Sequence, residues 1–272
     1  MSRKPVLLAM AVLVVAVIAA ALWLDPRAPG RERLRIDGAG DEATVVRAEA
    51  ESESVLPEAL AVAQEEAKRL GVKTLIVHRR GHRIFEYHAP GSAGTDLVDG
   101  GDLAAAILQL ALHQPEDASA DAGTTAQLLG ERIWMPLRAA DAWFSDGGPA
   151  GAVRSCCIEA RLDDWMRAAD LVNGGGTYLG ERVISVDAVR ALLSGRVLQA
   201  QGDEPLLARD GVAFDLDDEV RVWLAPRRGL TMLVRAGQGR ARDTLLPNVI
   251  LRGLNDAAPA IGGGISDLVP GH

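Results

Sequence analysis

Strand-forming segments lie near both ends of this chain, and helix-forming segments occupy the part between them. Two β-rich runs, 72–78 and 83–88, are joined by Arg79-Arg80-Gly81-His82, which predicts a hairpin. Three more β-rich runs follow near the other end, at 212–214, 220–225 and 230–235, separated by turn residues. We therefore expect an α+β fold, in which an antiparallel sheet is assembled from both ends of the chain and helices pack on it.

Apolar residues at helical spacing predict the helices. The clearest amphipathic pattern covers 159–172 and ends at Asn173-Gly174-Gly175-Gly176. Another helix begins near Leu56-Pro57, where proline suits the first turn, and ends before Gly71. Further helices are expected at 103–113, 126–132, 186–193 and 243–254.

The N-terminus has the pattern of a membrane-spanning segment. An uncharged apolar stretch, 5–24, follows Arg3 and Lys4. At about 1.5 Å per residue it spans roughly 30 Å, the hydrocarbon thickness of a bilayer. The two basic residues predict a cytoplasmic N-terminus, and therefore a single-pass anchor in a bacterial inner membrane with the remainder in the periplasm. The alternative is a signal peptide cleaved after the small residues 19–21, which would release a secreted protein.

Composition divides the rest of the chain. Residues 25–55 are charged and poor in large apolar side chains, which predicts a flexible stalk between the anchor (1–24) and the domain. The folded domain is expected at 56–256, and a Gly/Ala/Pro-rich flexible tail at 257–272.

Charge and cysteine content exclude several kinds of function. The net charge is −8 and there is no Lys/Arg-rich run, so no nucleic-acid partner is expected. The two cysteines, Cys156 and Cys157, are adjacent and cannot form a disulfide framework. The three histidines of the hairpin, His78, His82 and His88, lie at different heights along it, so we expect neither a metal site nor a cofactor.

Four segments carry a resemblance to one family. They are Trp134-Met135-Pro136-Leu137 with Asp141-Ala142-Trp143, the run from Cys156 to Gly175 with its Asp164-Trp165 and Asn173-Gly174-Gly175, the hairpin 74–87, and the turn and strand 226–235. They resemble the β-lactamase/penicillin-binding-protein serine hydrolases, in particular the class C β-lactamase-related branch of nylon-oligomer hydrolases and esterases. The resemblance implies a β-lactamase/DD-peptidase-like antiparallel sheet flanked by helices, in a reduced form.

The chemistry of that family needs three elements. A serine three residues before a lysine supplies the nucleophile and its base. A tyrosine, or a Ser/Tyr-x-Asn element, relays protons. A Lys/His-Thr/Ser/Gly-Gly strand faces the nucleophile and supplies electrostatic contacts to the substrate.

None of the three elements is present in this sequence. Its only lysines are Lys4, Lys68 and Lys73, and none follows a serine by three residues. Where the serine is expected, before the helix at 103–113, the sequence reads Asp99-Gly100-Gly101-Asp102. Neither tyrosine begins a Tyr-x-Asn, and Asp217-Asp218-Glu219 stands in place of the cationic strand start. We therefore expect no catalytic residues, and we interpret the domain as a pseudoenzyme.

The replaced motifs leave a set of acidic side chains: Asp99, Asp102, Asp217, Asp218 and Glu219. If the fold is kept, these carboxylates approach one another across the former cleft. One hypothesis is an acidic groove that holds a cation or a basic ligand; the other is that the groove is closed and the loops are solvated.

Two functions therefore remain open. The first is a non-catalytic binding or scaffolding module that is tethered to the membrane and contacts a periplasmic protein or a basic ligand. The second is a residual serine hydrolase, an esterase or amidase, with an unusual nucleophile such as Ser145, Ser155 or Cys157.

Overall fold

The structure, a computed structural model, describes residues 33–39, 45–92, 96–114, 117, 119–145, 158–194, 211–237 and 240–255. Within these ranges no helix combines the length and the apolar character that crossing a bilayer requires. The expected anchor (1–24) and tail (257–272) lie outside the described residues, as do Ser155, Cys156 and Cys157.

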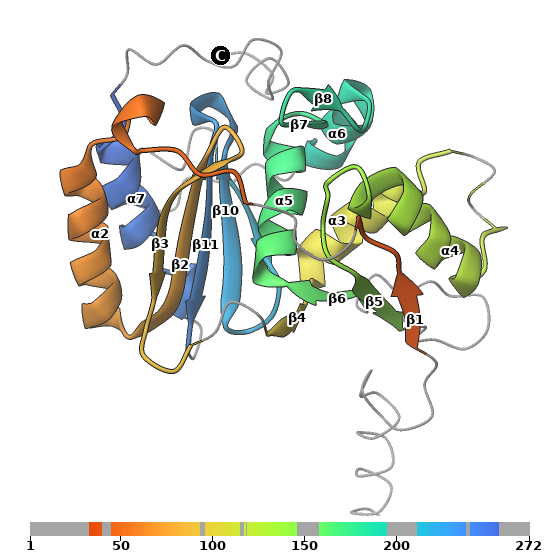
Figure 1. The fold of residues 1–272 in the computed structure, drawn as a ribbon, viewed down its shortest axis with the longest axis horizontal. Coiled ribbons are helices and arrows are strands. Elements are labelled where there is room, and N and C mark those ends of the chain that lie inside the picture. The colour runs from red at the N-terminus through yellow and green to blue at the C-terminus, as the bar shows by residue number, and fades with distance from the viewer. Residues whose placement is uncertain are drawn as a thin grey trace, which may run out of the picture.

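A five-stranded antiparallel sheet forms the centre of the domain, in the order β3-β2-β11-β10-β9 (Figure 1). Its strands are β2 (Val72–Arg79), β3 (His82–His88), β9 (Val212–Asp215), β10 (Val220–Ala225) and β11 (Leu230–Ala236). The hairpin from the first part of the chain pairs with the last strand, β11, through β2. The prediction of an antiparallel sheet built from both ends of the chain is confirmed.

Helices cover both faces of this sheet. α2 (Pro57–Leu70) and α7 (Leu245–Arg252) lie on one face, while α3 (Gly101–Ala111) and α5 (Leu162–Asn173) lie on the other (Figure 1). Side chains alternate along β2. Leu75 and Val77 therefore join the core beneath α2 and α7, whereas Ile76 joins the larger core beneath α3 and α5.

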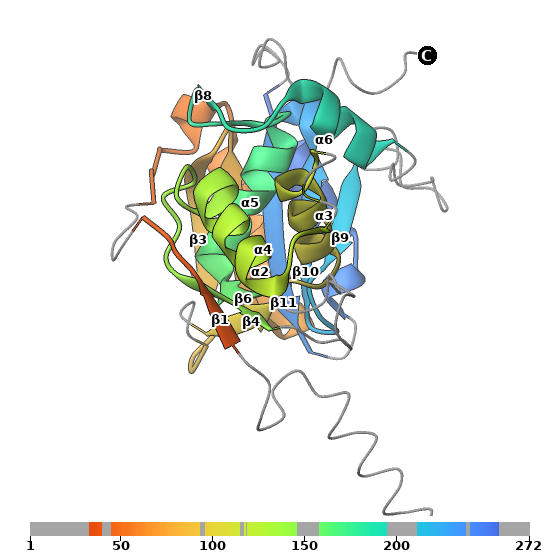
Figure 2. The same ribbon diagram turned by 90° about the vertical axis from the view of Figure 1, so that its right-hand side faces the viewer.

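A smaller four-stranded sheet stands beside the central one, in the order β1-β5-β6-β4 (Figure 2). Its strands are β1 (Arg33–Ile36), β4 (Leu97–Asp99), β5 (Ala142–Ser145) and β6 (Ile158–Arg161). The remaining elements are α4 (Ala122–Leu129), which continues as a π-helical turn (Gly130–Trp134), the short hairpin β7 (Thr177–Tyr178) and β8 (Glu181–Arg182), α6 (Val186–Leu193), and the 3-10 turns Glu51–Glu53, Pro226–Arg228 and Arg240–Arg242.

The segment expected to be a flexible stalk, 25–55, differs from that prediction wherever it is described. Arg33–Ile36 pairs antiparallel with β5, and Ile36 is fully buried. Further along, Val55 is buried and bridges to Leu254 at the end of α7. A few apolar side chains in a charged context are enough to fix these stretches, because segments distant in the sequence, β5 and the end of α7, pair with them.

The helix predicted at 159–172 begins later than expected. Residues 158–161 form β6, which pairs with β4 and β5, and the helix starts at Leu162. Apolar Ile158 and Ala160 alternate with charged Glu159 and Arg161, a strand-like pattern that the helical pattern of the following residues obscured.

The burial of β1 predicts a measurable stability effect. Ile36→Ala should lower the free energy of unfolding by about 2–5 kcal/mol, because it removes a fully buried side chain from the core. Val46→Ala is the matched control from the same stretch of chain; its side chain is 39% exposed, and it should change stability by no more than about 0.5 kcal/mol. Urea unfolding measures both. Equal, small effects of the two substitutions would contradict the burial of β1.

Candidate functional site

The start of α3 is the position at which the resemblance places a nucleophilic serine. Gly101 stands there with φ +43°, and a Cβ on it would lie 2.2 Å from the carbonyl oxygen of Leu216 and 2.5 Å from that of Asp215. A Cβ on Gly100 would lie 2.1 Å from the ring of Trp165. No side chain fits at either position without a shift of the surrounding backbone or ring, so the helix start cannot present a hydroxyl.

Tryptophan packing holds this junction in place. Trp165 is fully buried on α5 and donates a hydrogen bond from Nε1 to the carbonyl oxygen of Val98 at 2.9 Å. Its ring meets that of Trp134 edge to face, with the centroids 5.7 Å apart. Both are core residues. Trp143 is half-buried, and the guanidinium carbon of Arg33 lies over its ring, 5.2 Å from the ring centre.

Turn hydrogen bonds engage two of the five acidic residues. An oxygen of Asp99 accepts from the backbone N–H of Gly101 at 2.8 Å. One oxygen of Asp217 accepts from the N–H groups of Glu219 and Val220, both at 2.7 Å. These carboxylates therefore shape the start of α3 and the turn between β9 and β10.

The other three acidic residues lie in different surroundings. Glu219 forms an ion pair with Lys73 at 2.7 Å. Asp102 and Asp218 are exposed. Gly101, beside Asp99 and Asp102, packs against the backbone of Asp215 and Leu216, and of the five acidic residues Asp217 alone lines the adjoining pocket.

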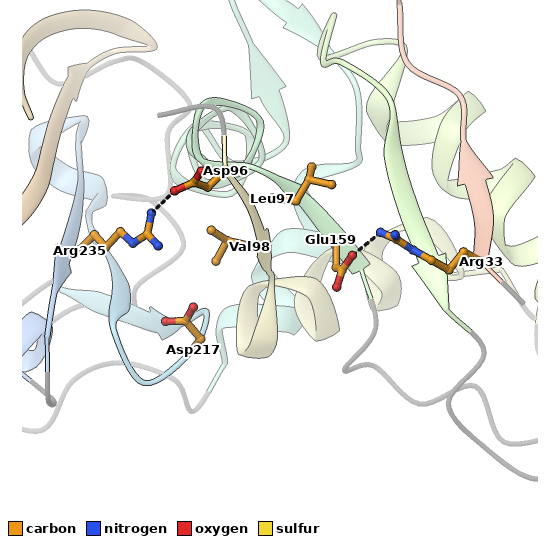
Figure 3. Close-up of a pocket in the computed structure, with 7 residues that line it drawn as sticks. All are labelled: Arg33, Asp96, Leu97, Val98, Glu159, Asp217 and Arg235. Atoms are coloured by element: carbon orange, nitrogen blue, oxygen red, sulfur yellow. Dashed lines mark hydrogen bonds and ion pairs between the residues drawn. The ribbon is translucent and has the colours of Figure 1, made fainter. Parts of the chain in front are cut away.

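That pocket has a volume of about 640 Å³ and is open to solvent (Figure 3). Its lining residues are Arg33, Asp96, Leu97, Val98, Glu159, Asp217 and Arg235. They come from β1, β4 and β6 of the smaller sheet and from β11 and the β9–β10 turn of the central sheet, or lie directly beside these strands (Figure 3).

Opposite charges are matched within the pocket. Arg33 forms an ion pair with Glu159, and Arg235 forms one with Asp96 at 3.0 Å (Figure 3). Two cations and three carboxylates share the wall, so the pocket is less acidic than the sequence alone predicted.

A buried histidine–aspartate pair links the hairpin to α5. His78 Nδ1 lies 2.6 Å from an Asp170 oxygen, and both side chains are at least 96% buried. Arg83 donates from Nε to His78 Nε2 at 3.4 Å and from a terminal nitrogen to Asp163 at 2.6 Å. Both ring nitrogens of His78 therefore face protein groups, a carboxylate at Nδ1 and a guanidinium at Nε2.

Sequence reasoning missed this pair. The two residues are 92 positions apart, and the single available signal was that His78 shares the α5-facing side of β2 with Ile76. The other hairpin histidines bond different carboxylates: His82 bonds Glu53 at 2.7 Å, and His88 bonds Glu86 at 2.6 Å. Across the part of the chain that the structure describes, no three His, Cys, Asp or Glu side chains gather where they could hold a metal ion.

Glu86 is the most perturbed carboxylate of this region. Burial alone would raise the pKa of Glu86, but hydrogen bonds from His88, Arg83 and Arg47 and the positive charge of Arg83 lower it to about 2. The group is thus ionised at any physiological pH and serves to hold β3 to the strand-like stretch around Arg47.

Ser145, one of the nucleophiles considered, is buried at the end of β5 opposite Arg33. Its hydroxyl makes no hydrogen bond to a histidine or lysine in the described residues.

The sequence matches no protein-family model and no curated protein. Solved structures do match. A structure from Bacillus anthracis, assigned as a 6-aminohexanoate-dimer hydrolase, superposes with a TM-score of 0.51 at 11% identity, over 82% of this chain and 88% of its own. A β-lactamase-like protein from Bacteroides dorei gives 0.47 at 12% identity (72% and 97%), and a D,D-transpeptidase domain from Legionella pneumophila gives 0.46 at 10% identity (77% and 98%).

The fold is therefore that of the β-lactamase-like serine hydrolases, with mixed helices and antiparallel sheets. The predicted resemblance is confirmed at the level of the fold by the hydrolase from Bacillus anthracis.

The crowding at the start of α3 predicts that any side chain added there lowers the stability of the domain. Gly101→Ala should lower the free energy of unfolding by at least about 1–3 kcal/mol, because it adds a Cβ against backbone at positive φ. Gly123→Ala in α4 is the matched control: the atom nearest to its Cβ lies 3.6 Å away, so stability should stay the same or rise by up to about 1 kcal/mol. Denaturant unfolding compares the two. A neutral Gly101→Ala would mean that the junction is open.

Proposed function

We propose that this chain is a catalytically inactive member of the β-lactamase-like fold, which serves as a binding or scaffolding module tethered to the inner membrane and facing the periplasm. The observation that carries this proposal is the contact of Gly101 with the backbone of Asp215 and Leu216, which removes the space a nucleophile would need. The missing Ser-x-x-Lys, Tyr-x-Asn and Lys/His-Thr-Gly motifs support it.

The partner we propose is a periplasmic protein or a basic ligand. Asp102 and Asp218 are exposed on either side of the α3 junction, and Asp217 lines the adjoining pocket. Asp99 is held by a turn N–H and Glu219 is paired with Lys73, so the exposed Asp102 and Asp218 are the carboxylates that a basic group would approach. The proposal involves no cofactor and no nucleic acid.

The competing function is a residual esterase or amidase that uses Ser145, Ser155 or Cys157. Its support is limited to the fold, since the hydrolase from Bacillus anthracis has the same architecture. The absence of an activating base beside Ser145 in the described structure favours the inactive module.

Turnover measurements separate the two functions. The purified full chain should show no saturable hydrolysis of p-nitrophenyl acetate or of a chromogenic β-lactam, because no nucleophile is presented beside a base. Ser145→Ala should give the same background rate. Saturable turnover that this substitution abolishes would instead establish the residual hydrolase.

Membrane tethering has its own test. The full chain produced in a bacterial host should sediment with membranes and resist extraction at high salt and alkaline pH, because residues 5–24 form an apolar stretch of spanning length. A form lacking residues 1–24 should be recovered in the soluble fraction. A full chain that is found soluble and shortened at about residue 21 would show that the segment is a cleaved signal.

A further inference from the structure

A second pocket, of about 560 Å³, lies at the opposite end of α5 from the former cleft. It is bounded by the last turn of α5, the β2–β3 turn and the β7–β8 hairpin, which come together at the top of the domain in Figure 1. Its volume falls within the usual range for small-molecule sites, about 300–1,000 Å³. Neither the fold comparison nor the proposed function accounts for it.

The walls of this pocket are largely apolar or bare backbone. Val46 and Leu179, two of the exposed large hydrophobic residues, line it with 39% and 38% of their surface open to solvent. Four of the twelve lining residues are glycines: Gly81, Gly174, Gly180 and Gly229. Leu179 lies across Gly81, since a Cβ on that glycine would be 3.4 Å from Leu179 Cδ2. A ligand can therefore reach backbone as well as aliphatic side chains.

One buried polar atom at the pocket wall lacks a partner. Asn173 lines the pocket and is only 6% exposed. Its Nδ2 donates to the Thr231 hydroxyl at 3.1 Å, whereas its Oδ1 makes no hydrogen bond within the described residues. A buried acceptor without a donor is costly; the atom itself is covered in this structure, so a ligand N–H satisfies it after a small shift of the pocket wall.

The charged groups around the pocket are neutralised inside the protein. Arg80 and His82 both bind Glu53, at 3.3 and 2.7 Å, and Asp170 is bound to His78. Burial raises the pKa of the Tyr178 hydroxyl to about 12, so it stays neutral. The surroundings therefore favour an uncharged ligand.

We propose that this pocket binds a small uncharged molecule with an aliphatic group and an amide N–H, the aliphatic group lying on Val46 and Leu179 and the N–H donating to Asn173 Oδ1. Such a ligand has the chemistry of an acylated amine or a short uncharged peptide. The inference goes beyond the proposed function, because it gives the domain a site that lies away from the former cleft.

A matched pair of probes tests the hydrogen bond. N-isopentylacetamide and isopentyl acetate have nearly the same shape, but only the amide carries an N–H. Saturation-transfer NMR titrations with the full chain should give a dissociation constant at least tenfold lower for the amide. Equal affinities, tighter binding of the ester, or no binding of the amide would overturn the proposal. Hydrolysis of the ester would release isopentanol in the same spectra, and that outcome would contradict the inactive-module proposal and not this one.

Substitutions of the two exposed aliphatic residues of the pocket test where the amide binds. Leu179→Ala and Val46→Ala should each weaken amide binding about threefold or more, and neither side chain is buried enough for folding to depend on it. Val62→Ala, on α2 with 52% of its surface exposed, is the matched control and should leave the dissociation constant unchanged. An unchanged affinity of Leu179→Ala, or an equal loss in Val62→Ala, would place the amide elsewhere and refute the assignment.

Discussion

The close approach of α3 to the turn between β9 and β10 determines whether a side chain fits at the start of α3. At that junction the backbone of Gly101 lies against the carbonyl groups of Asp215 and Leu216, and the ring of Trp165 fills the space beside Gly100. Helix, sheet edge and tryptophan meet with no room for a side chain. The resemblance places a nucleophile at the start of this helix, and this contact is the observation on which the proposal of an inactive module depends.

Buried polar groups hold the β2–β3 hairpin against α5. His78, Asp170 and Arg83 connect the hairpin to α5 beneath the sheet surface. A histidine paired with an aspartate would suggest a general base in many hydrolases, but here the free nitrogen of the ring already faces a guanidinium. Such buried ionic groups are expensive to break, because removing one partner leaves the other charge uncompensated. Their role is to fix the position of α5 against the sheet.

Much of the fold could be predicted from the sequence, because the main sheet and most helices depend on local periodicity. The hairpin, the last three strands and α6 (Val186–Leu193) lie where the apolar pattern placed them. The strand β1 could not be predicted in this way. Its four residues include two arginines, and only Ile36 is buried. The strand forms by pairing with β5, more than 100 residues further along the chain.

The candidate site could likewise be predicted only where it depends on residue types and not on contacts between distant segments. The missing Ser-x-x-Lys pair can be read from residue types alone, since none of the three lysines follows a serine by three residues. The contacts of the acidic residues depend on the folded structure instead. Asp99 and Asp217 accept hydrogen bonds from turn N–H groups, and arginines enter the pocket from β1 and β11.

The most direct test of the closed junction is the intact mass of the full chain after incubation with an excess of a fluorophosphonate, a β-lactam and a thiol-directed substrate analogue in turn. The account predicts that the mass stays that of the unmodified protein, since no hydroxyl or thiol is activated for acyl transfer. A stoichiometric adduct that forms rapidly and is blocked by a competing substrate would contradict it.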